Sequence, residues 1–219
     1  MNISIIIPFY NNNGSIHELF ERLACVAEHE LFNSHNIDLV LVEDGSKDDT
    51  YQRLKAMKKV FPSLQTNIVK LTRNFGSYNA FLAGVQYAEG DCCVYIHADL
   101  QDPPELIPQL FEYYLKGNKL VLANRSNRAD GNVFSTIYHF LVKKYALNNA
   151  PPGGFDLVLF DRKIRNDLLS ISEKNTNNVY LINWLGYPYA SIPYKREKRR
   201  HGKSQWGFCK KVKLFVDTF

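Results

Sequence analysis

The chain has 219 residues, of which 45% are hydrophobic and 22% charged, so it is long enough to bury a core of its own in one large domain. Its four cysteines, at positions 25, 92, 93 and 209, lack zinc-type spacing and suit a reducing cytoplasm. The sequence contains no run of eighteen apolar residues, and its first residues lack the basic flank of a signal peptide. Composition therefore predicts a globular protein rather than a disulfide scaffold or a membrane span.

The net charge of +5 is unevenly distributed. Residues 195–213 contain nine Lys or Arg and one Glu, which leaves a net charge of −3 on the rest of the chain. Such a segment could attract a phosphate backbone, but no nucleic-acid recognition module accompanies it, so we expect no specific nucleic-acid partner.

Apolar runs alternate with segments of helical periodicity along the first 123 residues. This alternation predicts an α/β fold in which a mainly parallel sheet carries helices on both faces. Strands are predicted at 3–8, 37–42, 66–71, in the run after Asp91, and at 119–123, 155–160 and 190–194. Helices are predicted at 15–32, 48–60, 77–88, 105–115, 132–147, 161–170 and 179–185, with a break at 151–154.

Polar side chains of different kinds follow four of the predicted strands: Tyr10, Asp44, Arg73 and Asp99. In an open parallel sheet the ligand crevice lies beyond the carboxyl ends of the strands, so these residues are expected to meet there. Together these four side chains suit a nucleotide. Tyr10 could stack on its base and Asp44 could accept hydrogen bonds from the base. Arg73 could bind the base or a phosphate, and Asp99 could hold the metal of a diphosphate. The alternative for Asp44 is an ordinary turn or cap residue.

The stretch from Asp91 to Glu105 begins as a buried strand and ends on charged residues. His97, Asp99 and Gln101 alternate, so in an extended chain they would point to one side and could hold a divalent cation. Asp102, with the proline and glutamate that follow it, has the pattern of a helix start and is predicted to be a structural N-cap.

Several segments, taken in order, resemble the family 2 inverting glycosyltransferases of the GT-A fold. The similarity is greatest to the polyprenyl-phosphate branch, which includes dolichyl-phosphate mannose synthase and the bacterial undecaprenyl-phosphate sugar transferases. The run Asp-Leu-Gln-x-Pro-Pro-Glu is its most specific element. The segments that carry the resemblance are 5–11, 42–50, 73–76, 98–105, 154–162 and 199–206.

The resemblance implies a Rossmann-like three-layer α/β/α domain of the GT-A type over residues 1–206. It also implies that Asp99 and Gln101 contact Mg²⁺ or Mn²⁺ and that Asp156 lies beside the acceptor as the candidate catalytic residue. The residues assigned to the nucleotide sugar and its phosphates are Pro8, Tyr10, Asp44, Arg73, Ala98, Asp99, Arg125, Arg199 and Ser204.

Three positions depart from the family pattern. His97 stands where the family usually has the first aspartate of Asp-x-Asp, which removes one hard oxygen ligand and favours Mn²⁺ over Mg²⁺ if His97 ligates the metal. The alternative is that His97 only forms a hydrogen bond with a ribose or a neighbouring backbone group. Val158 and Gln205 replace an arginine and a lysine, which leaves the donor sugar and the acceptor open.

The implied activity is transfer of a hexose from a nucleotide sugar, UDP-linked rather than GDP-linked, to a polyprenyl phosphate at the cytoplasmic face of the membrane. Two alternatives stay open: a transferase that extends a cell-surface polysaccharide or O-antigen, and a weakly catalytic nucleotide-binding module. A phosphate monoester is largely dianionic near neutral pH, so Asp156 need not remove a proton from such an acceptor, and orientation and general base catalysis both stay open for it; a hydroxyl acceptor would need Asp156 as a base.

Residues 207–219 place apolar side chains on one helical face and lysines elsewhere. This pattern predicts an interfacial helix drawn to anionic lipid, with an amphipathic helix docked on the domain as the alternative. Relatives often continue into transmembrane helices beyond this point, so we expect a chain truncated before them, with a peripheral enzyme of this length as the alternative. The oligomeric state is left open and includes a homo-oligomer.

Overall fold

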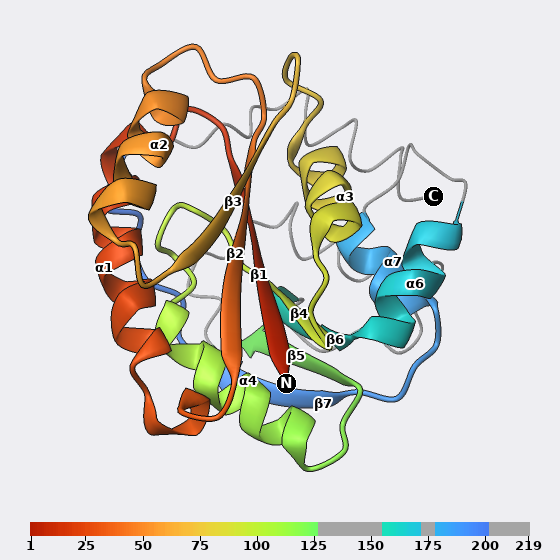
Figure 1. Ribbon diagram of the computed structural model, residues 1–219. Helices are drawn as coiled ribbons and strands as arrows, with labels where there is room; N and C mark the ends of the chain where they lie inside the picture. The colour runs from red at the N-terminus through yellow and green to blue at the C-terminus, as the bar shows by residue number, and fades with distance from the viewer. Residues whose placement is uncertain (127–154, 172–177, 202–219) are drawn as a thin grey trace.

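The computed structural model describes residues 1–126, 155–171 and 178–201 (Figure 1). These residues form a seven-stranded sheet in the order β3-β2-β1-β4-β6-β5-β7. The strands are β1 (Asn2–Phe9), β2 (Asn36–Glu43), β3 (Gln65–Lys70), β4 (Cys92–Tyr95), β5 (Leu120–Arg125), β6 (Phe155–Asp161) and β7 (Ala190–Tyr194). The α-helices are α1 (Ile16–Ala27), α2 (Thr50–Val60), α3 (Ser77–Tyr87), α4 (Ile107–Leu115), α6 (Arg162–Ser170) and α7 (Asn178–Trp184), and the 3₁₀ turns are η1 (Asn13–Ser15), η2 (Glu30–Phe32) and η3 (Pro104–Leu106).

The sheet is mainly parallel, as the sequence predicts. Strands β3, β2, β1 and β4 run in one direction, β6 pairs antiparallel with both β4 and β5, and β7 is parallel to β5. The carboxyl ends of β1 to β5 and β7 therefore lie at one edge of the sheet together with the first residues of β6. We call this the carboxyl edge.

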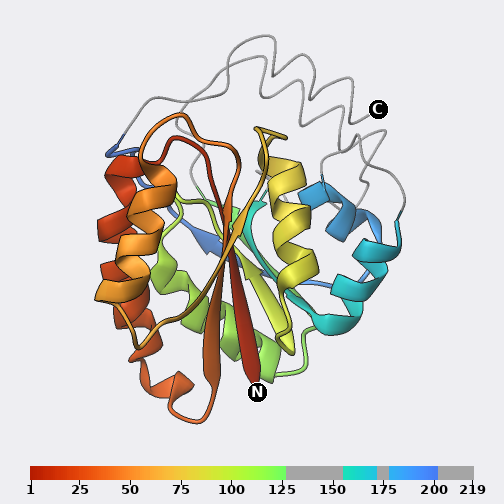
Figure 2. The ribbon, with the colours of Figure 1, turned by 45° about the horizontal axis from the view of Figure 1, so that its top comes forward.

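Helices cover both faces of the sheet, which confirms the predicted three layers (Figure 2). Helices α1, α2 and α4 pack on one face and bury every second side chain of the strands, those that point to this face. Helices α3, α6 and α7 pack on the opposite face. Cys92 and Cys93, which are adjacent in β4, belong to different faces because successive strand side chains alternate.

Most predicted boundaries agree with the structure to within two residues. The helix predicted from Ser15 to Phe32 is shorter: α1 ends at Ala27, and a separate 3₁₀ turn, η2, closes the segment. The helix predicted from Glu105 begins at Ile107 after η3, with Pro108 in its first turn, where a proline costs no hydrogen bond.

The predicted N-cap role of Asp102 is wrong. The N-cap of η3 is Pro103, without a side-chain cap, and Asp102 is fully buried in contacts with residues from the far end of the chain. Within the described ranges, none of the helices has the length and apolar character that crossing a bilayer requires. The predicted helix 132–147, the break at 151–154 and the tail 207–219 lie outside the described residues.

Candidate active site

Turns that follow β1, β2 and β3 are tied together at the carboxyl edge. Asn11, which has a left-handed backbone with φ 53°, donates its backbone N–H to Ser46 Oγ at 3.1 Å. Its own side-chain oxygen accepts the backbone N–H of Lys47 at 2.9 Å. Pro8 lies in β1, paired with Val42, and Tyr10 is the residue after the strand, so both occupy this linked region.

Asp44 joins the turns after β2 and β3. Its carboxylate is almost fully buried and accepts the backbone N–H groups of Phe75 at 2.7 Å and Gly76 at 3.0 Å. Gly45 has φ +63°, and a Cβ there would lie 2.4 Å from the Arg73 carbonyl carbon, so glycine is required for this approach. The turn-forming alternative for Asp44 is thus present in the structure, and the Arg73 backbone lies against Gly45, the residue after Asp44.

The turn after β4 differs from the sequence prediction. The chain turns at Ala98 and Asp99, and Leu100 is left-handed with φ 58°. The prediction that an extended chain aligns His97, Asp99 and Gln101 on one side is therefore wrong. Instead the His97 ring packs edge-on against Tyr95, with Nδ1 3.4 Å from the tyrosine hydroxyl oxygen. The Ala98 carbonyl is buried and accepts the Ser15 hydroxyl at 2.7 Å, so it supports the turn.

Asp99 and Gln101 nevertheless converge, on a guanidinium from a distant segment. Arg199 Nη2 donates to Asp99 Oδ2 at 2.6 Å and to Gln101 Oε1 at 3.4 Å. The other carboxylate oxygen, Oδ1, accepts the backbone N–H of Gln101 at 3.1 Å. A positively charged nitrogen therefore stands between two oxygens of the kind that Mg²⁺ and Mn²⁺ prefer, and this donor set fits a hard divalent cation.

The role of His97 as a third ligand stays a prediction, since the structure shows only its contact with Tyr95. Across the ranges that the structure describes, no three His, Cys, Asp or Glu side chains gather closely enough to form a metal site by themselves.

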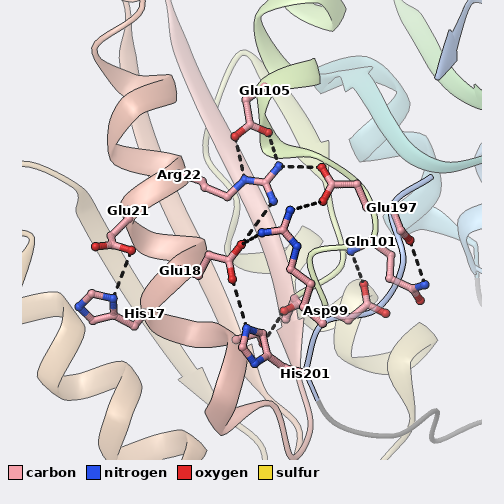
Figure 3. A network of polar contacts seen from close by, with 12 residues as sticks. His17, Glu18, Glu21, Arg22, Asp99, Gln101, Glu105, Glu197 and His201 are labelled. Atoms are coloured by element: carbon pink, nitrogen blue, oxygen red, sulfur yellow. Dashed lines mark hydrogen bonds and ion pairs between the residues drawn. The ribbon is translucent and has the colours of Figure 1, made fainter. Parts of the chain in front are cut away.

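Residues 195–201, the segment after β7, are anchored beside this turn (Figure 3). The Glu197 backbone N–H donates to the Gln101 carbonyl at 2.9 Å, and Gln101 Nε2 donates to the Glu197 carbonyl at 3.3 Å. Arg22 of α1 binds Glu105 through two parallel hydrogen bonds and lies 3.4 Å from a Glu197 carboxylate oxygen. Arg200 bridges the Glu197 carboxylate, at 2.9 Å, to α1.

A second cluster forms where β5, β6 and β7 meet the carboxyl edge. Arg125 ends β5 and Asp156 is the second residue of β6, and a register shift after Ala123 places them side by side. Arg125 Nε donates to Asp156 Oδ2 in a close ion pair. Tyr194 ends β7 and pairs with Arg125 of β5. Its hydroxyl donates to Asp102 at 2.5 Å and lies 3.4 Å from Asp156 Oδ2.

The two carboxyl groups of this cluster have pKa values shifted in opposite directions. Burial raises the pKa of Asp102, and the negative charge of Asp156 raises it further. Burial also opposes ionisation of Asp156, but the positive charges of Arg125 and Arg196 outweigh it and hold the pKa of Asp156 below its ordinary value. Asp156 is therefore a carboxylate at neutral pH and a weak base.

The predicted site residues within the described ranges thus lie along the carboxyl edge. Ser204 lies outside the described residues. Sequence reasoning missed Tyr194, Arg196 and the buried contacts of Asp102. Only Tyr194 had a signal: it ends an apolar strand directly before the basic segment, and the carboxyl end of a strand is where functional side chains gather.

The family model described as Glycosyl transferase family 2 matches residues 4–197. The chain belongs to glycosyltransferase family 2. Over 218 residues this family 2 glycosyltransferase is 33% identical to the uncharacterized glycosyltransferase YkcC of Bacillus subtilis, a match that covers 98% of this chain and 66% of the relative. It is 30% identical to the undecaprenyl-phosphate 4-deoxy-4-formamido-L-arabinose transferase of Pectobacterium carotovorum, which covers 99% of this chain and 66% of that protein.

These values mean that the chain spans about two thirds of the length of these curated relatives. Among solved structures, it is similar to glucosyl-3-phosphoglycerate synthase from Mycobacterium tuberculosis in complex with Mn²⁺, UDP and glucosyl-3-phosphoglycerate. The TM-score is 0.64 at 18% identity, over 92% of this chain and 73% of that one. The likeness confirms the predicted GT-A fold of this family 2 glycosyltransferase.

Proposed function

We propose that this family 2 glycosyltransferase transfers a hexose, with inversion, from a nucleotide diphosphate sugar to a polyprenyl phosphate at the cytoplasmic face of a membrane. The observation that carries the proposal is the arrangement of two Asp–Arg pairs on one edge of the sheet, Asp99 with Arg199 and Asp156 with Arg125. The first suits a metal-bound diphosphate and the second an anionic acceptor. Undecaprenyl phosphate in the name of a 30% identical relative supports the acceptor class.

The donor would lie across the turns that follow β1 to β4. Tyr10 and Pro8 flank the base, while Asp44 holds the turn that presents Arg73. Asp99 and Gln101 would hold Mg²⁺ or Mn²⁺ through Asp99 Oδ2 and Gln101 Oε1, the two oxygens that face Arg199. When bound, the metal would stabilise the negative charge that develops on the leaving diphosphate.

Arg199 contributes to the same step from the protein side. A guanidinium within reach of the diphosphate oxygens stabilises charge where it appears, and its planar fork matches phosphate geometry. UDP in one structural neighbour's complex and GDP-mannose in another's support a nucleotide diphosphate sugar as the donor, and the preference for uridine stays a prediction from the sequence.

The electrostatics of Asp156 favour a phosphate acceptor over a hydroxyl. A phosphate monoester has a second pKa of about 6, so it arrives largely deprotonated and needs no base. Asp156 has a pKa below its ordinary range because Arg125 and Arg196 outweigh the effect of burial, which makes it a weak base for a sugar hydroxyl. We infer that Arg125 contacts the acceptor phosphate while Asp156 fixes the direction of the Arg125 guanidinium.

A donor screen tests the proposal. UDP- and GDP-hexoses are incubated with a short-chain polyprenyl phosphate, or with an oligosaccharide acceptor, in the presence of Mn²⁺, and products are identified by mass spectrometry. We expect a glycosyl polyprenyl phosphate from a UDP-hexose. Transfer to the oligosaccharide alone would replace the lipid acceptor with a saccharide, and nucleotide binding without transfer to either would favour the nucleotide-binding module.

A further inference from the structure

We propose that Arg199 is an internal counter-ion of Asp99 and that it is exchanged for the divalent metal when the nucleotide diphosphate arrives. The exchange would make metal and nucleotide bind as a linked pair. This inference rests on the proposed function, because it takes Asp99 and Gln101 as the metal's protein ligands.

The competition follows from the positions of individual atoms. Asp99 Oδ1 is already used by the backbone N–H of Gln101, so Oδ2 is the oxygen left for a cation, and Arg199 Nη2 lies 2.6 Å from it. Gln101 Nε2 is held by the Glu197 carbonyl, which turns Oε1 toward the same guanidinium at 3.4 Å. A metal bound to these two oxygens and a guanidinium at those distances would repel each other, so one must leave.

Asp99 and Arg199 both have little access to water, so either charge is costly to keep without its partner. The side chains of Asp99 and Arg199 are 11% and 24% exposed. Metal alone would leave the Arg199 guanidinium without its carboxylate. Diphosphate alone would draw Arg199 away and leave the Asp99 carboxylate facing phosphate oxygens of the same charge.

With both ligands present, every charge has a partner. Asp99 would have the metal as its partner, and Arg199 would exchange its hydrogen bonds to Asp99 and Gln101 for charge-assisted hydrogen bonds to the diphosphate. Each ligand thereby removes the penalty that opposes the other. By thermodynamic linkage the increase in affinity is reciprocal.

The backbone around Arg199 can stay in place during this exchange. Glu197 is fixed to Gln101 by two hydrogen bonds, and Arg200 is tied to Glu18 at 2.8 Å and to Glu197 at 2.9 Å. Arg199 lies between these anchors, so the exchange requires only rotation of its side chain. Figure 3 shows Glu197 and Gln101 in contact beside Asp99, with the α1 residues on the other side of the segment.

The test compares Arg199→Gln with Lys198→Gln, which removes the same charge from an exposed position of the same segment. Binding of Mn²⁺ alone is measured by electron paramagnetic resonance, and binding of UDP with and without Mn²⁺ by calorimetry. We expect Arg199→Gln to bind Mn²⁺ alone at least about fivefold more tightly than the wild type and to show a smaller enhancement of UDP binding by Mn²⁺. Lys198→Gln should change the Mn²⁺ affinity by less than about twofold, because its charge is screened by solvent.

Arg199→Lys keeps a cation at the position and should leave the affinity for Mn²⁺ alone near the wild-type value, which separates competition from an altered fold. Equal Mn²⁺ affinities in Arg199→Gln, Lys198→Gln and wild type would overturn the counter-ion exchange and leave the metal site intact. Failure of every variant to bind Mn²⁺, with or without UDP, would instead contradict the metal-dependent function itself.

Discussion

Two Asp–Arg pairs stand on the same edge of this sheet, but their backbones are supported differently. Asp156 and Arg125 come from the hydrogen-bonded strands β6 and β5, so the sheet register holds them together. Asp99 and Arg199 are 100 residues apart in sequence and come from a turn and from the segment after β7. This difference in backbone support is why we propose different roles for chemically equal pairs: orientation of an acceptor for the fixed pair, and exchange of partners for the pair between two loops.

The largest expected effects come from removing the two carboxylates in turn. Asp99→Asn should lower kcat/KM for every acceptor by about 100- to 1,000-fold, since the metal that stabilises the leaving diphosphate is lost.

Asp156→Asn should lower transfer to a sugar alcohol by at least about 100-fold and transfer to a polyprenyl phosphate by less than about tenfold. Steady-state kinetics with both acceptors measure this, and equal losses in Asp156→Asn would refute the distinction between base and orienting group.

Removing each arginine in turn should lower the free energy of unfolding by different amounts in the two pairs. Arg125→Gln removes the close ion pair of Asp156 beside the buried carboxyl group of Asp102 and leaves Arg196 to offset its charge, so we expect the free energy of unfolding to fall by about 3 kcal/mol. Arg199→Gln should cost about 1 kcal/mol, because Asp99 keeps a backbone hydrogen bond.

Urea denaturation measures both losses. Adding Mn²⁺ with UDP should restore the free energy of unfolding that Arg199→Gln loses, because the ligands bind at Asp99 in the folded state only. The same addition should leave the difference between Arg125→Gln and the wild type unchanged. Recovery of both variants to the same extent would mean that the pairs are not functionally distinct.

The smallest expected effect is a pH dependence within the fixed cluster. Burial raises the folded-state pKa of Asp102 above its unfolded value of about 3.9, so the wild type should lose stability relative to Asp102→Asn as pH rises from about 4 through the folded pKa. Asn keeps an acceptor for the Tyr194 hydroxyl. Urea midpoints in metal-free buffer between pH 4 and pH 8 check this, and a difference between the two proteins that is independent of pH would show that Asp102 does not titrate there.

Asp156→Asn provides the opposite control. Burial is outweighed by Arg125 and Arg196, and the folded-state pKa of Asp156 is lowered. Its contribution to stability is therefore present above about pH 4 and is lost as pH falls through the folded pKa. The difference between wild type and Asp156→Asn should shrink on acidification, whereas the wild type should gain relative to Asp102→Asn.

The sequence by itself determined the layered α/β fold and the family, because both depend on local periodicity and on short motifs at strand ends. Apolar runs and amphipathic spacing are visible along the chain, and parallel strands bring their carboxyl ends to one edge whatever the details of their packing. This is why the sequence alone predicts Tyr10, Asp44, Arg73 and Asp99 at the same edge.

Tertiary structure alone decided the partners within the site. The turn at Ala98 and Asp99 directs His97 toward Tyr95 rather than toward Gln101, and no alternation in sequence reports a left-handed Leu100. Asp102 has a helix-start pattern, yet burial beneath Tyr194 overrides that local preference. The contacts of Asp102 with Tyr194 and of Asp99 with Arg199 join residues about 90 to 100 positions apart, and their energies depend on distance and solvent exclusion, which only the folded chain sets.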